Sequence, residues 1–267
     1  MNFYNNQFFP YILENKINHV ICTGDFFDHG TRQDVNLLLR VKNEFLNFFE
    51  KNKIMLTILV GNHDIYYKNT REVTTLDFFD SYQYLRVIKE PTIMEIGNIT
   101  WELYPWLLSG EGFAPKSKYI IGHFEINGFE MTRGNVCESG MTKDIFAQYD
   151  AVWSGHFHIK SQIDDILMLG NPSQTNKGDL GYKRGFHVFN TDDRVLTFIE
   201  NPYEVYTSLN YTDDINVLDY DFSKYENLFV NVNITSYLKV DTVKLNLFVD
   251  TLNQHAHSVD IVEWENE

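Results

Sequence analysis

The stretch VICTGDFFDHG, residues 20–30, decides the fold class of this chain. Its apolar start predicts a buried strand, which stops at a glycine followed at once by Asp25 and, three residues later, by Asp28. The same design, a short run rich in β-branched and aromatic residues that ends near glycine or proline, recurs along the chain. The runs are HVIC (19–22), IMLTILV (54–60), ITWELY (99–104), KYIIG (118–122) and AVWSG (151–155).

A helix pattern separates the first two runs. The segment QDVNLLLRVKNEFLNFFEKN, residues 33–52, carries apolar residues at a spacing close to 3.6, which predicts an amphipathic helix and hence a β-α-β unit. Apolar strands that alternate with such a helix are typical of a sheet covered on both faces, so we predict an α/β fold.

The character of the chain changes after Asn201. A polar, acidic and tyrosine-rich stretch comes first, and the runs LFVNVNI, DTVKLNLFVDTLNQHA and SVDIVEW follow it. These three runs predict a small β-α-β appendage. We place the boundary near residue 205, which gives a main domain over residues 1–205 and a second domain over residues 206–267.

Composition limits the class of protein. Hydrophobic residues make up 43% of the 267 residues and aromatic residues 15%, which excludes a mainly disordered chain. The sequence contains neither an apolar stretch of about 18 residues nor a secretory leader pattern, so we expect a soluble protein of the cytoplasm without membrane contact. The two cysteines, Cys22 and Cys137, lie in a strand and a polar loop and do not form a disulfide framework.

The net charge of −15 argues against simple electrostatic binding of a polyanion and favours bound metal ions, because clustered carboxylates need a counter-charge. Metal-capable side chains follow four of the strand ends, and in a parallel sheet such ends meet at one edge. Their mixed oxygen and nitrogen donors suit manganese, iron or zinc better than calcium. They are Asp25, Asp28, Asn62, His63, Asp64, His123, His156 and His158.

The spacing of these residues suggests two metal ions. His156 and His158 point the same way if the chain there is extended, so neighbouring ions can take one imidazole each. The two oxygens of Asp25 can bridge both ions. Two ions about 3.5 to 4 Å apart can hold a phosphate and generate a hydroxide nucleophile, which implies phosphoester hydrolysis.

Each of these residues also has a simpler structural role when taken alone. Asp25 can cap a helix or stabilise a turn, Asn62 can adopt a positive φ, and a single histidine after a strand is commonly structural. The coincidence of four such residues or groups at four strand ends favours the metal site. We interpret Trp101, Trp106 and Trp153 as core residues rather than as a stacking platform.

At these positions the sequence resembles the calcineurin-like metallophosphoesterases, whose pattern is D-x-H, GD-x-x-D, GNH-D/E, a lone GH and GH-x-H. The segments GNHDIYYKN, IGHFEINGF, VWSGHFH, LGNPSQT and RGFHVFN also resemble the SbcD-type DNA repair nucleases, notably those of tailed phages. The likeness spans residues 18 to 200 or so. It implies layered β-sheets flanked by helices, and the tail resembles the family's small capping domain more loosely.

The resemblance also implies roles for single residues. Asp25 would bridge two divalent ions, which the family suggests are manganese, and His158 would bind one of them while Asn62, His123 and His156 bind the other. His63 would be the general acid, with Asp64 orienting its imidazole and Asp28 lying behind it. The implied activity is that of a DNA exonuclease or endonuclease subunit in recombination and double-strand-break repair. It would act on DNA with an SbcC-type ATPase, as a homodimer, in the host cytoplasm if the gene is phage-encoded.

One part of the family pattern is missing, because no D-x-H precedes residue 25. One ion would then keep only Asp25 and His158, so we expect weak or absent activity from the chain as it stands and a truncated or split gene product. Two alternatives stay open. The chain is another calcineurin-like phosphoesterase, acting on nucleotides or phosphoproteins, or it is a non-catalytic interaction protein.

Overall fold

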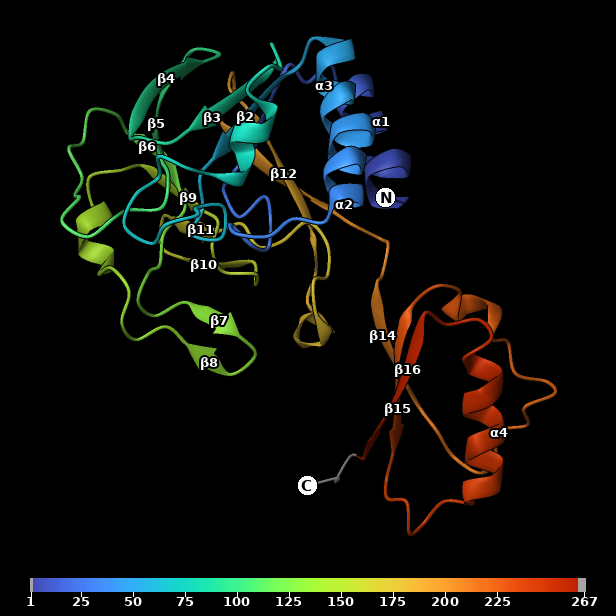
Figure 1. Cartoon of the computed structure of the whole chain (residues 1–267). Helices are drawn as coiled ribbons and strands as arrows, with labels where there is room; N and C mark the ends of the chain where they lie inside the picture. The colour runs from blue at the N-terminus through green and yellow to red at the C-terminus, as the bar shows by residue number, and fades with distance from the viewer. Residues whose placement is uncertain (1, 264–267) are drawn as a thin grey trace. The chain divides into compact units, whose positions relative to one another are not determined.

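The computed structural model describes residues 2–263, which form two compact units (Figure 1). The first unit contains the chain through Asn171 together with Lys183–Glu200, and the second contains Pro172–Tyr182 and the chain from Asn201 onward. Residues 172–182 belong to the second unit because the Gln174 side chain accepts the N–H groups of Val205 and Tyr206, at 2.7 and 2.8 Å. The sequence boundary near residue 205 did not anticipate this contribution.

The first unit begins with a three-stranded parallel sheet in the order β1-β2-β3. The chain between β1 and β2 is helical, which confirms the predicted β-α-β unit, and its first turn is capped by the Asp34 carboxylate, 3.0 Å from the Leu37 nitrogen. The strands are β1 (His19–Cys22), β2 (Met55–Leu59) and β3 (Leu85–Ile88), and the helical segments are α2 (Val35–Arg40), a π-helical stretch (Val41–Leu46) and α3 (Asn47–Asn52).

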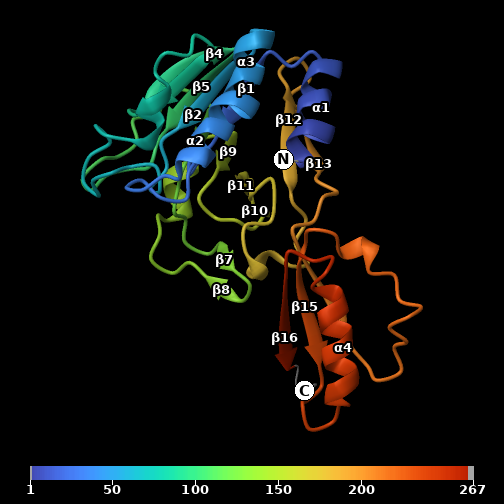
Figure 2. The same cartoon turned by 45° about the vertical axis from the view of Figure 1, so that its right-hand side comes forward.

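Helices α1, α2 and α3 lie together on one side of this sheet (Figures 1 and 2). Helix α1 (Phe9–Glu14) continues a π-helical turn, Tyr4–Phe8. The rings of Phe9 and Phe48 stack with centroids 4.0 Å apart, and Phe49 packs in the same core as Leu56 of β2. Burial of these side chains holds the helices to the sheet, at roughly 1.5 to 3 kcal/mol for each large apolar side chain.

The second sheet has six strands in the order β10-β11-β9-β6-β5-β4. Its four inner strands are parallel and its two outer strands are antiparallel to their neighbours. One apolar cluster joins the two sheets, with Leu59 of β2 packed among Leu103 of β5 and Ile121 of β6. The strands are β4 (Thr92–Ile96), β5 (Ile99–Tyr104), β6 (Tyr119–Gly122), β9 (Ala151–Ser154), β10 (Ser161–Ile163) and β11 (Ile166–Met168).

Two antiparallel pairs and two short 3-10 helices complete the first unit, and a third 3-10 helix belongs to the second. The ring of Phe189 in β12 contacts Trp101 and Trp153 of the second sheet, with centroids 5.4 and 4.9 Å apart. The pairs are β7 (Glu130–Thr132) with β8 (Asn135–Val136) and β12 (Gly185–Asn190) with β13 (Val195–Glu200); the 3-10 helices are Thr75–Phe79, Lys143–Phe146 and, in the second unit, Lys177–Asp179.

The second unit is a parallel three-stranded sheet, β14-β15-β16, with α4 packed on one face (Figure 1). Leu245 and Phe248 of α4 are buried in one cluster with Val230 and Val232 of β15, so the predicted β-α-β appendage is confirmed. Strand β14 was not predicted, and Trp264 of the run SVDIVEW lies outside the described residues. The elements are β14 (Tyr206–Asn210), a 3-10 turn (Ser223–Tyr225), β15 (Phe229–Ile234), α4 (Thr242–Leu252) and β16 (Ser258–Glu263).

Across residues 2–263, the helices are too short or too polar to cross a membrane.

Candidate metal centre

The candidate site lies where strand ends from both sheets of the first unit meet. Asp25 and Asn62 follow β1 and β2 of the three-stranded sheet, whereas His123 and His156 follow β6 and β9 of the six-stranded sheet. The expectation of a single sheet edge is therefore corrected. The Trp106 N–H donates to the Val60 carbonyl at 2.7 Å, which joins the end of β2 to the loop after β5 and holds the two sheets together near the site.

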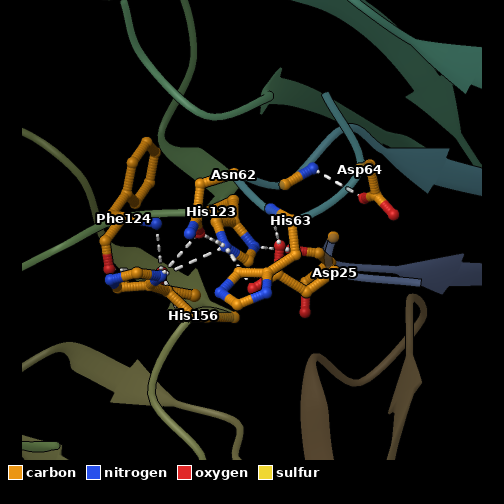
Figure 3. Close-up of polar contacts among 12 residues, drawn as sticks. Asp25, Asn62, His63, Asp64, His123, Phe124 and His156 are labelled. Atoms are coloured by element: carbon orange, nitrogen blue, oxygen red, sulfur yellow. Dashed lines mark hydrogen bonds and ion pairs between the residues drawn. The ribbon is translucent and has the colours of Figure 1, made fainter. Parts of the chain in front are cut away.

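Four polar side chains converge there (Figure 3). The ligand atoms of Asp25, His123 and His156 all lie within 4.8 Å of one another. The His123 Nε2 atom is 3.1 Å from Asp25 Oδ2 and 3.2 Å from His156 Nδ1. The Asn62 Oδ1 atom is 2.9 Å from His123 Nε2 and 3.0 Å from His156 Nδ1. Two oxygens and two imidazole nitrogens thus face a common space.

The protonation of His123 shows what this space can hold. Its Nδ1 atom lies 2.7 Å from the Thr23 carbonyl, which can only accept, so Nδ1 carries a proton. In the neutral ring, Nε2 then directs a lone pair toward the oxygens of Asp25 and Asn62. Converging lone pairs repel one another unless a cation lies between them. The mixed oxygen and nitrogen donors fit a divalent transition-metal ion.

The electrostatics prepare these groups for metal binding. Burial lowers the pKa of His156 to about 4, so its imidazole is neutral, as a metal ligand must be. Burial raises the pKa of Asp25, but the contact with His123, in the form of that ring that carries a second proton on Nε2, and the His63 N–H lower it more, and the net pKa is below the ordinary value. At neutral pH the site therefore presents a carboxylate beside neutral His156.

The backbone explains why glycines end these strands. Asp25 and His156 have φ values of +50° and +81°, a region that non-glycine residues seldom adopt and that is often found at functional sites. A Cβ atom on Gly61 would lie well inside van der Waals contact with the Asp25 carboxylate and amide, and one on Gly24 would overlap the His123 ring. The glycines let the loops approach closely enough for the donors to converge.

His63 and Asp64 lie beside the converging donors, with different contacts. The His63 N–H donates to Asp25 Oδ1 at 2.8 Å, and its Nδ1 atom is 2.7 Å from the Asp28 carbonyl oxygen. The carboxylate of Asp64 is buried and accepts the N–H groups of Gly61 and Phe27 at 2.9 and 3.1 Å. Burial raises the Asp64 pKa to about 6 despite those bonds. Asp64 thus braces the loops after β1 and β2, and the residue in contact with the His63 ring is Asp28.

His158 is not one of the three residues whose ligand atoms cluster within 4.8 Å, among the residues the structure describes. Its backbone is firmly held, because its carbonyl accepts the Asn171 N–H at 3.1 Å and a guanidinium N–H of Arg184.

Comparison with known proteins identifies the family of the chain. Residues 3–205 match the calcineurin-like phosphoesterase family. The chain belongs to this family. It is also 28% identical over 264 residues to exonuclease subunit 1 of Enterobacteria phage T4, a match that covers 96% of this chain and 75% of that protein. Calcineurin-like phosphoesterases are metal-dependent hydrolases, and the convergence of Asp25, His123 and His156 agrees with that membership.

Two residues of this phosphoesterase site were not found from the sequence. Thr23 sets the His123 proton through its carbonyl, which a sequence pattern cannot reveal. Trp106, interpreted as a core residue, is only half-buried, and its ring centroid lies 5.1 Å from that of His156. It lines a pocket of about 190 Å³ with His123, Glu125 and Ser139. The available signal was its position, because Pro105 and Trp106 follow a fifth strand end, that of β5.

Proposed function

We propose that this calcineurin-like phosphoesterase is the nuclease subunit of a DNA-processing complex and hydrolyses phosphodiester bonds with divalent ions. The observation that carries the proposal is the convergence of Asp25, Asn62, His123 and His156 on one space, at 2.9 to 3.2 Å between neighbouring donor atoms. The likeness to a phage exonuclease subunit over 96% of the chain supports DNA as the substrate.

We assign Asp25, Asn62, His123 and His156 to one ion, and Asp25 with His158 to a second. The mixed carboxylate, amide and imidazole donors suit manganese, iron or zinc, and manganese is our choice among them because the family resemblance suggests it. When bound, such ions polarise the phosphate and lower the pKa of a water molecule. The protein supplies the rest: its glycine-ended strands fix the donors, and the pocket beside His123 leaves room for a substrate group.

His63 is our candidate for the general acid that protonates the leaving oxygen. Its Nδ1 proton points to the Asp28 carbonyl at 2.7 Å, and the Asp28 carboxylate lies 4.0 Å from the same atom. These contacts orient the ring through Nδ1 and leave Nε2 as the atom that can face a leaving oxygen. Asp28 is thus our candidate for the group that orients His63, and Asp64 is our candidate for the group that holds the loops after β1 and β2 together.

The chain is proposed to work in an assembly. The phage relative is by its name one subunit of an exonuclease, and a net charge of −15 gives this chain little electrostatic attraction for DNA. We therefore propose an SbcC-type ATPase partner that helps to hold the DNA, a homodimeric nuclease, and a role in recombination and double-strand-break repair.

Hydrolysis of a linear DNA duplex in the presence of Mn²⁺ tests the proposal, with EDTA as the blank. We expect His63→Ala to lower the rate about 10²- to 10⁴-fold, as loss of a general acid does, and His123→Ala to abolish metal-dependent hydrolysis. His255→Ala, in the second unit, is the matched control. Faster hydrolysis of a small phosphomonoester or a phosphoprotein than of DNA selects another phosphoesterase activity. Absence of all turnover, with fewer than two metal ions per chain in titration, selects the non-catalytic alternative.

A further inference from the structure

A closed loop, residues 65–74, follows His63, the candidate general acid, and Asp64. We call it the tyrosine loop. Ile65 and Thr74 form an antiparallel bridge at its base, and the Tyr66 N–H donates to the Val73 carbonyl at 3.0 Å. Because three residues of extended chain span at most about 11 Å, the Cα atom of Tyr66 lies no farther than that from the Cα atom of His63. The backbone at the start of this loop therefore stays within about 11 Å of the backbone of His63, which itself donates its N–H to Asp25.

Two tyrosines at the start of the loop are exposed. Tyr66 is 47% exposed and Tyr67 51%, and their rings pack edge to face with centroids 4.7 Å apart at an angle of 74°. The pair forms an aromatic surface that is accessible to solvent, three and four residues after His63. Aromatic side chains in this position are the groups on which unpaired nucleobases stack.

The far side of the loop is anchored by a buried arginine. The Arg71 guanidinium donates to both carboxylate oxygens of Glu111 at 2.6 Å, to Glu90 at 2.8 Å and to the Trp106 carbonyl at 2.7 Å. Its side chain is only 1% exposed. Arg71 thus ties the tyrosine loop to the loop that carries Trp106 beside His156. A loop held in this way presents its aromatic rings with little conformational entropy left to lose on binding.

The net charge of the chain also favours recognition of bases over recognition of phosphate groups. With a net charge of −15, contacts to phosphate groups contribute little affinity, whereas stacking on a base does not depend on charge. We propose that Tyr66 and Tyr67 form a platform on which unpaired nucleobases of a DNA strand stack beside the metal centre. The inference rests on the proposed function and adds the group of the substrate that the protein recognises.

Binding without hydrolysis tests the platform. The probe is a fluorescein-labelled single-stranded 12-residue oligothymidylate, measured by fluorescence anisotropy in Ca²⁺, and its reference is an abasic oligomer with the same phosphates. We expect the double variant Tyr66→Ala/Tyr67→Ala to bind oligothymidylate about 5- to 150-fold more weakly, the range for one stacked base, and to bind the abasic oligomer as before. Tyr66→Phe/Tyr67→Phe keeps both rings and should bind like the wild type. Phe78→Ala removes another exposed aromatic ring of the first unit and is the matched control.

The proposal is overturned if the alanine variant binds oligothymidylate like the wild type, if it loses affinity equally for the abasic oligomer, or if the phenylalanine variant loses as much. It is also overturned if the wild type does not prefer the base-bearing oligomer. Hydrolysis of bis(p-nitrophenyl) phosphate in Mn²⁺ reports the metal centre separately. A wild type that hydrolyses neither this ester nor DNA contradicts the proposed function. The anisotropy measurements then still show whether Tyr66 and Tyr67 bind nucleobases.

Discussion

Arg71 illustrates how a buried charge can be accommodated at the scale of one residue. Its guanidinium has two carboxylate partners and carbonyl acceptors, including that of Trp106, so the charge is neutralised and its donors are used. Removing one partner of such a network leaves buried charge without compensation. Because Arg71 joins two loops that border the metal centre, its network affects both the stability and the shape of the site.

We predict that Arg71→Ala lowers the free energy of unfolding by about 3 to 5 kcal/mol, measured by urea denaturation. Arg71→Lys should recover only part of the loss, because an ammonium group cannot form the paired bonds to Glu111. Arg40→Ala is the control, since Arg40 pairs with Glu44 on the surface and should cost less than about 1 kcal/mol. An equal effect of the two alanine variants would contradict the role of the Arg71 network.

At the scale of the element, β2 positions the site through the glycine at its end. Replacing Gly61 by alanine places a Cβ atom against the Asp25 carboxylate and amide, so the loop after β1 must move. We predict that Gly61→Ala weakens Mn²⁺ binding at least about 10-fold, measured by isothermal titration calorimetry, as supporting residues of metal sites do. Gly112→Ala is the control because a Cβ atom there meets no neighbour within 4 Å. Unchanged affinity in Gly61→Ala would show that the loops tolerate the displacement.

Strand β1 carries a histidine that makes stability depend on pH. Burial, with the charge of Arg86, lowers the pKa of His19 to about 4, and its Nε2 atom lies 2.8 Å from Thr57 Oγ1 of β2. In the unfolded chain His19 takes up a proton near pH 6.5, whereas in the folded protein it does so only near pH 4. The contribution of His19 to stability is therefore present above pH 6.5 and is lost as the pH falls from 6.5 toward 4.

We predict that His19→Gln makes the urea midpoint less sensitive to pH between 6.5 and 4 than in the wild type. His29→Gln is the control because His29 lies in an exposed loop. Parallel pH profiles for the wild type and His19→Gln would exclude His19 as a source of the dependence.

At the scale of the whole molecule, the converging metal ligands all belong to the first unit. An ion bound only by the folded state stabilises it by mass action, by about 2.7 kcal/mol at a concentration of 100 times its dissociation constant. We predict that Mn²⁺ increases the protection of β2 and β6 amides from hydrogen exchange, measured by mass spectrometry, and that EDTA reverses it. Asp25→Asn should remove the effect, and Asp28→Asn, whose side chain is exposed and outside the cluster, should keep it. An effect that persists in Asp25→Asn would place the ion elsewhere.

The elements that were predicted well are those with a strong local signal. All five apolar runs are strands, the helical segment before β2 lies where the 3.6-residue spacing of apolar residues predicts it, and α4 lies in the run DTVKLNLFVDTLNQHA that was predicted as the helix of the appendage. Strand β14 was missed because its sequence, YTSLN, is polar and sits in a tyrosine-rich acidic stretch. Its pairing with β15 is decided by hydrogen bonds to a distant strand, which no local pattern encodes.

The sequence by itself determined the five strands with apolar runs, the glycine or proline near their ends and the kinds of side chain that follow. These depend on local periodicity and on backbone freedom within a few residues. Only the tertiary structure decided that the ligands come from two sheets, that the Thr23 carbonyl sets the His123 proton, that Asp28 and not Asp64 contacts the His63 ring, and that Arg71 joins two loops. The contacts of Thr23 with His123, of Asp28 with His63 and of Arg71 with Glu111 each join residues at least 35 positions apart. Long-range packing sets such contacts, because only the folded chain brings distant backbone groups within hydrogen-bonding distance.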